Sequence, residues 1–201
     1  MSLCGNIYRN ILLDCNFGAS SVNEILYIIN FDDLLFIEED EEGSVTKLQL
    51  VAGASMYTFQ GKRNSVEPGY YMFPLIYSDS FSHYIDFRVF EYTPEIKQQL
   101  EKLKFGKYIA ILEMVVNGEV FREAFGLHSG MELMQLQRIV SDYENSGSYA
   151  LSLETPLLSV EPYIPQQYTG DLESIGAACW ILSTGFWNDG CTWFDTSNWI
   201  D

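Results

Sequence analysis

Two histidines, His83 and His128, are the side chains best suited to proton transfer near neutral pH. His83 falls in an alternating apolar stretch, and His128 falls in the turn-rich sequence Gly126–Gly130. No nucleophile or orienting partner is recognisable for either one. The motifs of serine hydrolases, P-loops, dinucleotide-binding folds and zinc proteases are also absent from the sequence. We therefore expect structural or surface histidines and a protein that is not an enzyme.

Metal and redox chemistry would need the four cysteines, which lie in two pairs near the chain ends: Cys4, Cys15, Cys179 and Cys191. Neither pair has the close spacing that metal and redox sites usually show, and a zinc site would have to combine distant cysteines. We expect reduced, mostly buried thiols and no cofactor. A disulfide that joins the two ends of the chain stays open as an alternative.

Carboxylates dominate the charged residues. The chain has 28 acidic and 11 basic residues, so its net charge is −17. Such a charge repels phosphate backbones and anionic membranes, which argues against ordinary nucleic-acid binding and membrane docking. Five adjacent carboxylates repel one another, so they predict a solvated loop between strands. They lack the alternating oxygen ligands around a glycine that a calcium loop needs. This acidic loop consists of Glu38, Glu39, Asp40, Glu41 and Glu42.

The elements that must position these residues are mostly strands. Alternating or continuous apolar stretches predict strands over 24–31, 45–51, 55–60, 81–90, 131–140 and 148–154. Asn117-Gly118 predicts a hairpin between 107–116 and 119–127. Residues 61–70 predict a turn-rich loop that holds the adjacent basic pair Lys62 and Arg63. One helix is predicted over about 93–105, with Thr93 as N-cap and Pro94 at its first position.

These elements indicate a mainly β fold, an antiparallel β-sandwich or open barrel with one flanking helix. We expect an N-terminal arm over 1–24, a core domain over 25–168 and a C-terminal segment over 169–201. The 201 residues suit one domain that needs no disulfide or metal to fold. The beginning of the chain does not resemble a signal peptide and no apolar run is long enough to cross a membrane, so we expect a soluble protein made in the cytosol.

The end of the chain is unusual because it holds all the tryptophans, at positions Trp180, Trp187, Trp193 and Trp199. Glycine, asparagine and aspartate residues interrupt them, so the spacing fits neither a heptad nor a regular strand. Two interpretations stay open. The segment folds back on its own domain, or it inserts its rings into a neighbouring subunit, as tryptophans do at interface hot spots.

Ten short segments together resemble a family of bacteriophage virion proteins that is common in phages and prophages of Bacteroidetes-type hosts. In chain order they are Cys4–Asn6, Leu13–Cys15, Ile28–Asp33, Phe59–Ser65, Phe87–Lys97, Leu100–Leu103, Gly106–Glu113, Phe125–Glu132, Gly147–Leu151 and Glu161–Pro165. The resemblance covers roughly residues 1–168, and the tryptophan-rich end departs from it.

The resemblance implies a tail-tube-type subunit, a β-sandwich with one flanking helix that stacks in rings around a channel. On this expectation the chain is found in the virion tail, and in the host cytoplasm before assembly. Its partners are copies of itself, in a six-fold or twelve-fold ring, and other tail proteins. Phage DNA would pass without sticking, with the acidic loop facing the lumen.

The candidate subunit contacts are the N-terminal arm, the 61–70 loop with Lys62 and Arg63, and the four tryptophans. A head-to-tail connector or tail-barrel ring of a short-tailed phage is the alternative within this class. A monomeric carbohydrate- or peptide-binding β-sandwich is the alternative from another class.

Overall fold

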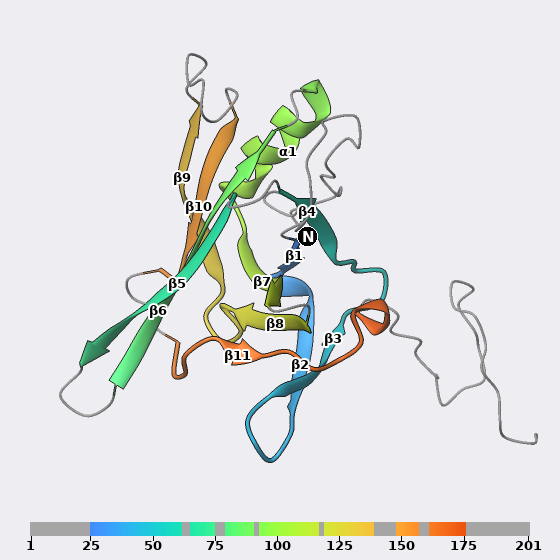
Figure 1. Cartoon of the computed structure of the whole chain (residues 1–201). Coiled ribbons are helices and arrows are strands. Elements are labelled where there is room, and N and C mark those ends of the chain that lie inside the picture. Colours follow the sequence, from blue (N-terminus) through green and yellow to red (C-terminus); the bar gives the residue numbers. More distant parts are fainter. Residues whose placement is uncertain are drawn as a thin grey trace, which may run out of the picture.

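The protein is mainly β, with antiparallel strands and one α-helix, which confirms the fold class that the sequence predicts (Figure 1). The computed structural model describes residues 25–61, 65–74, 79–90, 93–116, 119–138, 148–156 and 161–175. The strands are β1 Ile25–Asn30, β2 Leu34–Glu39, β3 Val45–Leu50, β4 Tyr57–Gln60, β5 Val66–Pro74, β6 Asp79–Val89, β7 Lys107–Val116, β8 Glu119–Phe125, β9 Met131–Arg138, β10 Tyr149–Glu154 and β11 Gln166–Gln167. The helices are η1 Phe31–Asp33, α1 Pro94–Leu103 and η2 Leu172–Ser174.

Strand β7 lies in the middle of a nine-stranded antiparallel sheet. Its first edge pairs with β1, and its second edge pairs with the start of β9 and then with β8. From β9 the sheet continues through β10 and β6 to β5, and from β1 it continues to β4. Strands β2 and β3 form a separate hairpin. Among the described strands, β5 therefore has a neighbour on one side only.

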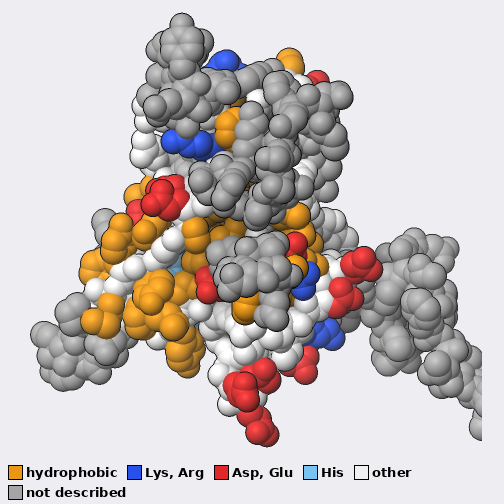
Figure 2. All heavy atoms as spheres, in the orientation of Figure 1, with side chains coloured by type: hydrophobic (Ala, Val, Ile, Leu, Met, Phe, Trp, Pro, Cys, Tyr) orange, Lys and Arg blue, Asp and Glu red, His pale blue; other side chains and the backbone are white. Residues whose placement is uncertain are grey.

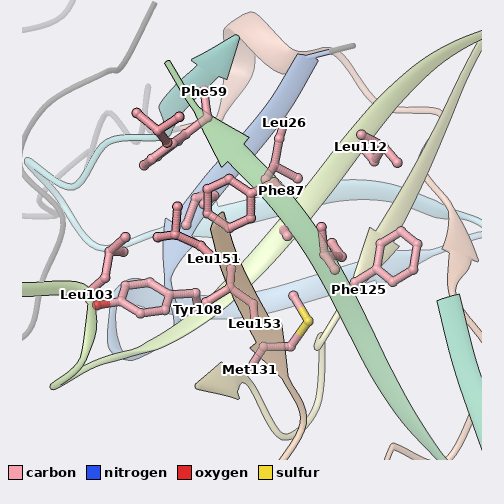
Figure 3. Packing of buried hydrophobic residues seen from close by; sticks show 14 of the residues in the cluster. Leu26, Phe59, Phe87, Leu103, Tyr108, Leu112, Phe125, Met131, Leu151 and Leu153 are labelled. Carbon is pink, nitrogen blue, oxygen red and sulfur yellow. The ribbon is translucent and has the colours of Figure 1, made fainter. Parts of the chain in front are cut away.

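Both faces of β7 are buried, and each face supplies a different hydrophobic core. Tyr108, Ala110 and Leu112 belong to the first core, which the α1 stripe and the inward residues of β6 and β10 complete (Figure 3). Ile109 and Ile111 belong to the second core, which the β2–β3 hairpin covers. A buried aliphatic side chain contributes about 1.5–3 kcal/mol, so this two-sided burial anchors the centre of the sheet.

Helix α1 covers the first core, as its apolar spacing predicts. Its N-cap Thr93 accepts a hydrogen bond at Oγ1 from the Ile96 backbone N–H, at 3.3 Å. Ile96, Leu100 and Leu103 are buried, at the i, i+4 and i+7 spacing of a single stripe. The helix ends at Leu103, two residues before the predicted end.

The predicted loop over 61–70 is wrong in its second half, where Val66–Tyr70 belong to β5. Pro68 and Gly69, which the sequence analysis interpreted as turn residues, lie inside this strand. Gly69 pairs with Tyr84 of β6, and a Cβ atom on Gly69 would collide with the Tyr84 ring. The glycine is therefore a site of close packing between strands.

The last described residues pack onto the β2–β3 hairpin. Tyr168 bridges to Val45 of β3, and the Thr169 N–H donates to the Val45 carbonyl at 2.9 Å. Ile175 is buried in the second core. Residues 1–24 and 176–201 lie outside the described residues, so the expected N-terminal arm and most of the C-terminal segment are untested.

Candidate functional site

The most distinctive surface is the distal half of the β5–β6 hairpin, residues 69–74 and 80–84, which we call the ribbon. It extends from the body beyond the other described strands, at the lower left of Figure 1. Four consecutive large apolar residues of β5 are exposed: Tyr70 by 49%, Tyr71 by 54%, Met72 by 57% and Phe73 by 42%. Figure 2 shows hydrophobic side chains gathered over this region. Such a concentration is a candidate interaction surface, because exposed apolar residues on proteins are usually scattered.

The ribbon is apolar on both faces. Directly opposed residues of antiparallel strands share a face, so Tyr70 and Met72 lie on the face of their partners His83 and Phe81. The Tyr70 and Phe81 rings meet edge to face, with their centroids 6.1 Å apart. This face continues from the first core, to which Ile85 and Phe87 of β6 belong.

On the opposite face, Tyr71 stacks on Tyr84 with a centroid distance of 4.9 Å and an interplanar angle of 20°. Phe73 is the next β5 residue on that face. A hairpin that is apolar on one face can cover a core. One that is apolar on both faces beyond the core needs another partner.

The outer edge of β5 has an unusual set of hydrogen-bonding groups. Phe81 exchanges backbone hydrogen bonds with Glu161, at 2.8 and 2.9 Å, so its backbone groups point away from β5. The alternation along β6 then directs the groups of Ser82 and Tyr84 toward β5, where they face Tyr71 and Gly69.

The backbone groups of Pro68, Tyr70, Met72 and Pro74 consequently point outward. Proline has no N–H, so the outward donors of this stretch are limited to Tyr70 and Met72. Prolines at outward positions cost no hydrogen bond to β6, which is why an edge strand tolerates them. No described strand pairs with this edge, and its few donors suit a short additional strand rather than a long one.

The ribbon as defined has no charged residue, although Asp79, which begins β6 and pairs with Pro74, adjoins its distal end. Residues 69–74 and 80–84 contain no Asp, Glu, Lys or Arg, although the whole chain carries a net charge of −17. Glu67 and Asp86 mark the point where charged residues resume toward the body. Copies of a strongly acidic protein repel one another. Two uncharged surfaces meet with less electrostatic repulsion than two acidic ones.

His83 lies at the base of the ribbon and is 2% exposed. Its Nδ1 accepts a hydrogen bond from the Gly126 N–H at 3.1 Å, and its Nε2 donates to the Tyr163 carbonyl at 2.9 Å. The Phe125 ring meets the imidazole edge to face. Burial lowers the pKa of His83 to about 4, against the opposing effect of the Tyr163 carbonyl. The ring is therefore neutral at pH 7 and both of its nitrogens are engaged by backbone groups.

Glu161 completes this buried cluster and is 1% exposed. Its carboxylate accepts from the backbone N–H of Ser129, at 2.8 Å, and from that of His128, at 3.1 and 3.2 Å. Burial raises the pKa of this carboxyl, and the two backbone donors partly offset the rise. Together with His83, Glu161 joins the 126–130 turn and the 161–163 segment to the base of the ribbon.

Both histidines lie beside Tyr163. The His128 side chain is exposed, and its ring lies 5.7 Å from that of Tyr163. Sequence reasoning did not find Glu161 or Tyr163, because both reach this cluster from distant parts of the chain. It also did not single out the exposed ribbon, although the unbroken apolar run Tyr70–Phe73 was a readable signal.

The predicted acidic loop is the tip of the β2–β3 hairpin, and all five of its residues are exposed: Glu38, Glu39, Asp40, Glu41 and Glu42. Asp40 Oδ1 accepts from the backbone N–H of Glu42 and Ser44, at 2.9 and 2.8 Å, and so shapes the turn. Figure 2 shows acidic side chains at this tip, at the bottom of the molecule. The prediction of a solvated loop between strands is confirmed, with Glu38 and Glu39 as the last residues of β2.

The remaining predicted contact residues lie outside the described ranges. Lys62 and Arg63 fall in the gap between Gly61 and Ser65. The four tryptophans and Cys179 and Cys191 fall in 176–201, and Cys4 and Cys15 fall in 1–24.

Within the described residues, no group of three or more His, Cys, Asp or Glu side chains is arranged to hold a metal ion. No helix in the same part of the chain is long and apolar enough to span a membrane. Comparison with known proteins found no matching family model, no matching curated protein and no matching solved structure.

Proposed function

We propose that this chain is a structural protein of a bacteriophage virion that forms a ring or tube of the tail around the DNA channel. The ribbon is the single observation that carries the proposal. It is a projection with two apolar faces, an edge that no described strand pairs with, and no charged residue over 69–74 and 80–84, on a protein of net charge −17. A neighbouring subunit that covers both faces would remove this apolar surface from water.

The sequence resemblance to phage virion proteins supports the same role. The fold that the resemblance implies is a β-sandwich with a flanking helix, and the observed fold is mainly β with α1 over one core. A projection on one side of the body also suits a ring, because ring interfaces join two different surfaces of the subunit. A head-to-tail connector or tail-barrel ring is the same proposal at another place in the particle.

The acidity has a place in this function. In a ring with the β2–β3 tip turned inward, Glu38–Glu42 would repel the phosphates of passing DNA. The exposed position of this hairpin tip leaves it available for that role.

Electron microscopy and light scattering of the purified full-length chain test the proposal. We expect rings or tubes, and we expect Met72→Glu to abolish them because it places a charge on the uncharged ribbon. Met134→Glu on β9 is the matched control, since Met134 is exposed by 55% and Met72 by 57%. Rings that persist in Met72→Glu, or their loss in both variants, would refute the assignment of the ribbon. A chain that stays monomeric at all concentrations would refute the ring itself.

A second candidate is a carbohydrate- or peptide-binding module, which the exposed tyrosines favour. The outward side of the stacked Tyr71–Tyr84 pair offers an aromatic surface. This function requires a monomer that binds ligand, so an array of glycans and peptides, read out by the same scattering experiment, separates it from the ring. Binding that Tyr71→Ala removes, in a chain that never assembles, would establish it.

A further inference from the structure

We infer that the ribbon of one copy is covered by the tryptophan segment, residues 176–201, of the neighbouring copy. This inference rests on the proposed function and names the partner of its central surface.

The ribbon sets the requirements for whatever covers it. The outward donors on β5 are limited to the Tyr70 and Met72 N–H groups, between Pro68 and Pro74, so a pairing strand has to be short. The two faces present large rings and a thioether, which favour aromatic partners over small or charged side chains. The occupant is therefore a short extended stretch flanked by large rings that can wrap both faces.

The tryptophan segment has this composition. It holds Trp180, Trp187, Trp193 and Trp199, together with Phe186 and Phe194, separated by Gly, Asn, Ser and Asp residues. Such spacing allows short extended stretches between turns. The segment contains three Asp and no Lys or Arg. The acidic remainder of the molecule repels this negative charge, whereas an uncharged surface does not.

Chain length and position favour a neighbouring copy as the source. The 26 residues that follow Ile175 span up to about 3.3 Å each when extended, so the segment is long enough to leave its own domain. Ile175 follows η2, which lies on the opposite side of the body from the ribbon (Figure 1). Two copies placed side by side would bring the end of one body toward the ribbon of the next. That contact joins different surfaces and can close into a ring.

A complementation experiment with two variants of the chain tests the inference. One variant ends at residue 175 and keeps the ribbon, and the second carries Met72→Glu and keeps the segment. We expect each to be monomeric alone and their mixture to form a one-to-one heterodimer by light scattering. Thermal unfolding verifies that both variants are folded. In a parallel control mixture, Met134→Glu replaces Met72→Glu.

All four tryptophans lie in this segment, so tryptophan fluorescence reports on it alone. We expect acrylamide to quench the assembled protein weakly, and Met72→Glu, but not Met134→Glu, to increase the quenching. Two monomers that never associate in the mixture would overturn the inference, as would quenching that Met72→Glu leaves unchanged. If the truncated chain still forms rings, the segment is not the occupant while the proposed ring stands. If the full-length chain forms none, the proposed function itself fails.

Discussion

Protonation of His83 should destabilise the protein between pH 6.5 and pH 4. The neutral ring accepts from the Gly126 N–H at Nδ1 and donates to the Tyr163 carbonyl at Nε2. A second proton on Nδ1 would face the Gly126 N–H and turn an attractive contact into a repulsive one. Because His83 is buried, water cannot compensate for the lost hydrogen bond.

The magnitude follows from the pKa of His83, which burial lowers from 6.5 to about 4. In this range the unfolded chain binds the proton and the folded chain does not, so the free energy of unfolding falls as the pH falls. Each pH unit in the window costs about 1.4 kcal/mol, which gives a loss of roughly 3 kcal/mol at pH 4. Below that pH the loss levels off, because both states are then protonated.

Urea unfolding at a series of pH values measures this loss against His83→Gln, which has no imidazole to titrate. We expect the variant to be less stable at pH 7, and the wild-type advantage to shrink by roughly 3 kcal/mol by pH 4. That change corresponds to a shift of about 1–2 M in the difference between urea midpoints. His128→Gln controls for the loss of a neighbouring but exposed histidine. Unfolding free energies of wild type and His83→Gln that run parallel from pH 7 to pH 4 would refute the reasoning.

Two further predictions concern the turn beside His83 and the assembly. Gly126 has a φ of +69°, and an added Cβ would lie 2.8 Å from Met131 Cγ. Gly126→Ala should therefore lower the free energy of unfolding, measured by chemical denaturation, by about 3 kcal/mol. Gly43 has a φ of +82° with open space around it, so Gly43→Ala should cost only about 1–2 kcal/mol; equal losses would contradict the packing argument. Salt should promote assembly, because shortening the Debye length from about 30 to about 8 Å screens the repulsion between copies; light scattering that shows salt dissolving the oligomers would contradict an uncharged contact.

Local signals in the sequence predicted much of the fold. The pairing of β7 with β8 and the N-cap Thr93 before α1 were both predicted, because both features depend on neighbouring residues only. The β5 strand was missed because Pro68 and Gly69 usually break strands. Both are compatible with this strand, since the Pro68 backbone points outward and Gly69 leaves space for the Tyr84 ring.

The buried cluster at the base of the ribbon could not be predicted in the same way. His83 and Tyr163 are 80 residues apart, and Glu161 and Ser129 are 32 residues apart. Strand β10 pairs with one edge of β6, and the 161–163 segment lies along the same edge farther on, at Phe81. The contacts arise only because the chain returns to this edge. No pattern in the sequence around Glu161 marks it as a buried carboxylate, and with 28 acidic residues there are many candidates.

The acidity and the apolar ribbon make sense together. The chain has a net charge of −17. At physiological ionic strength the Debye length is about 8 Å, so two copies repel each other weakly at larger separations and strongly at contact. Two acidic faces that meet repel each other more than two uncharged ones do. In the proposed assembly the charge would therefore disfavour contacts elsewhere and leave the ribbon as the favoured contact. The acidic β2–β3 tip and the ribbon are separate projections (Figure 1), so an assembly built through the ribbon leaves the tip in solvent. In the proposed ring, the same carboxylates would repel DNA from the channel wall.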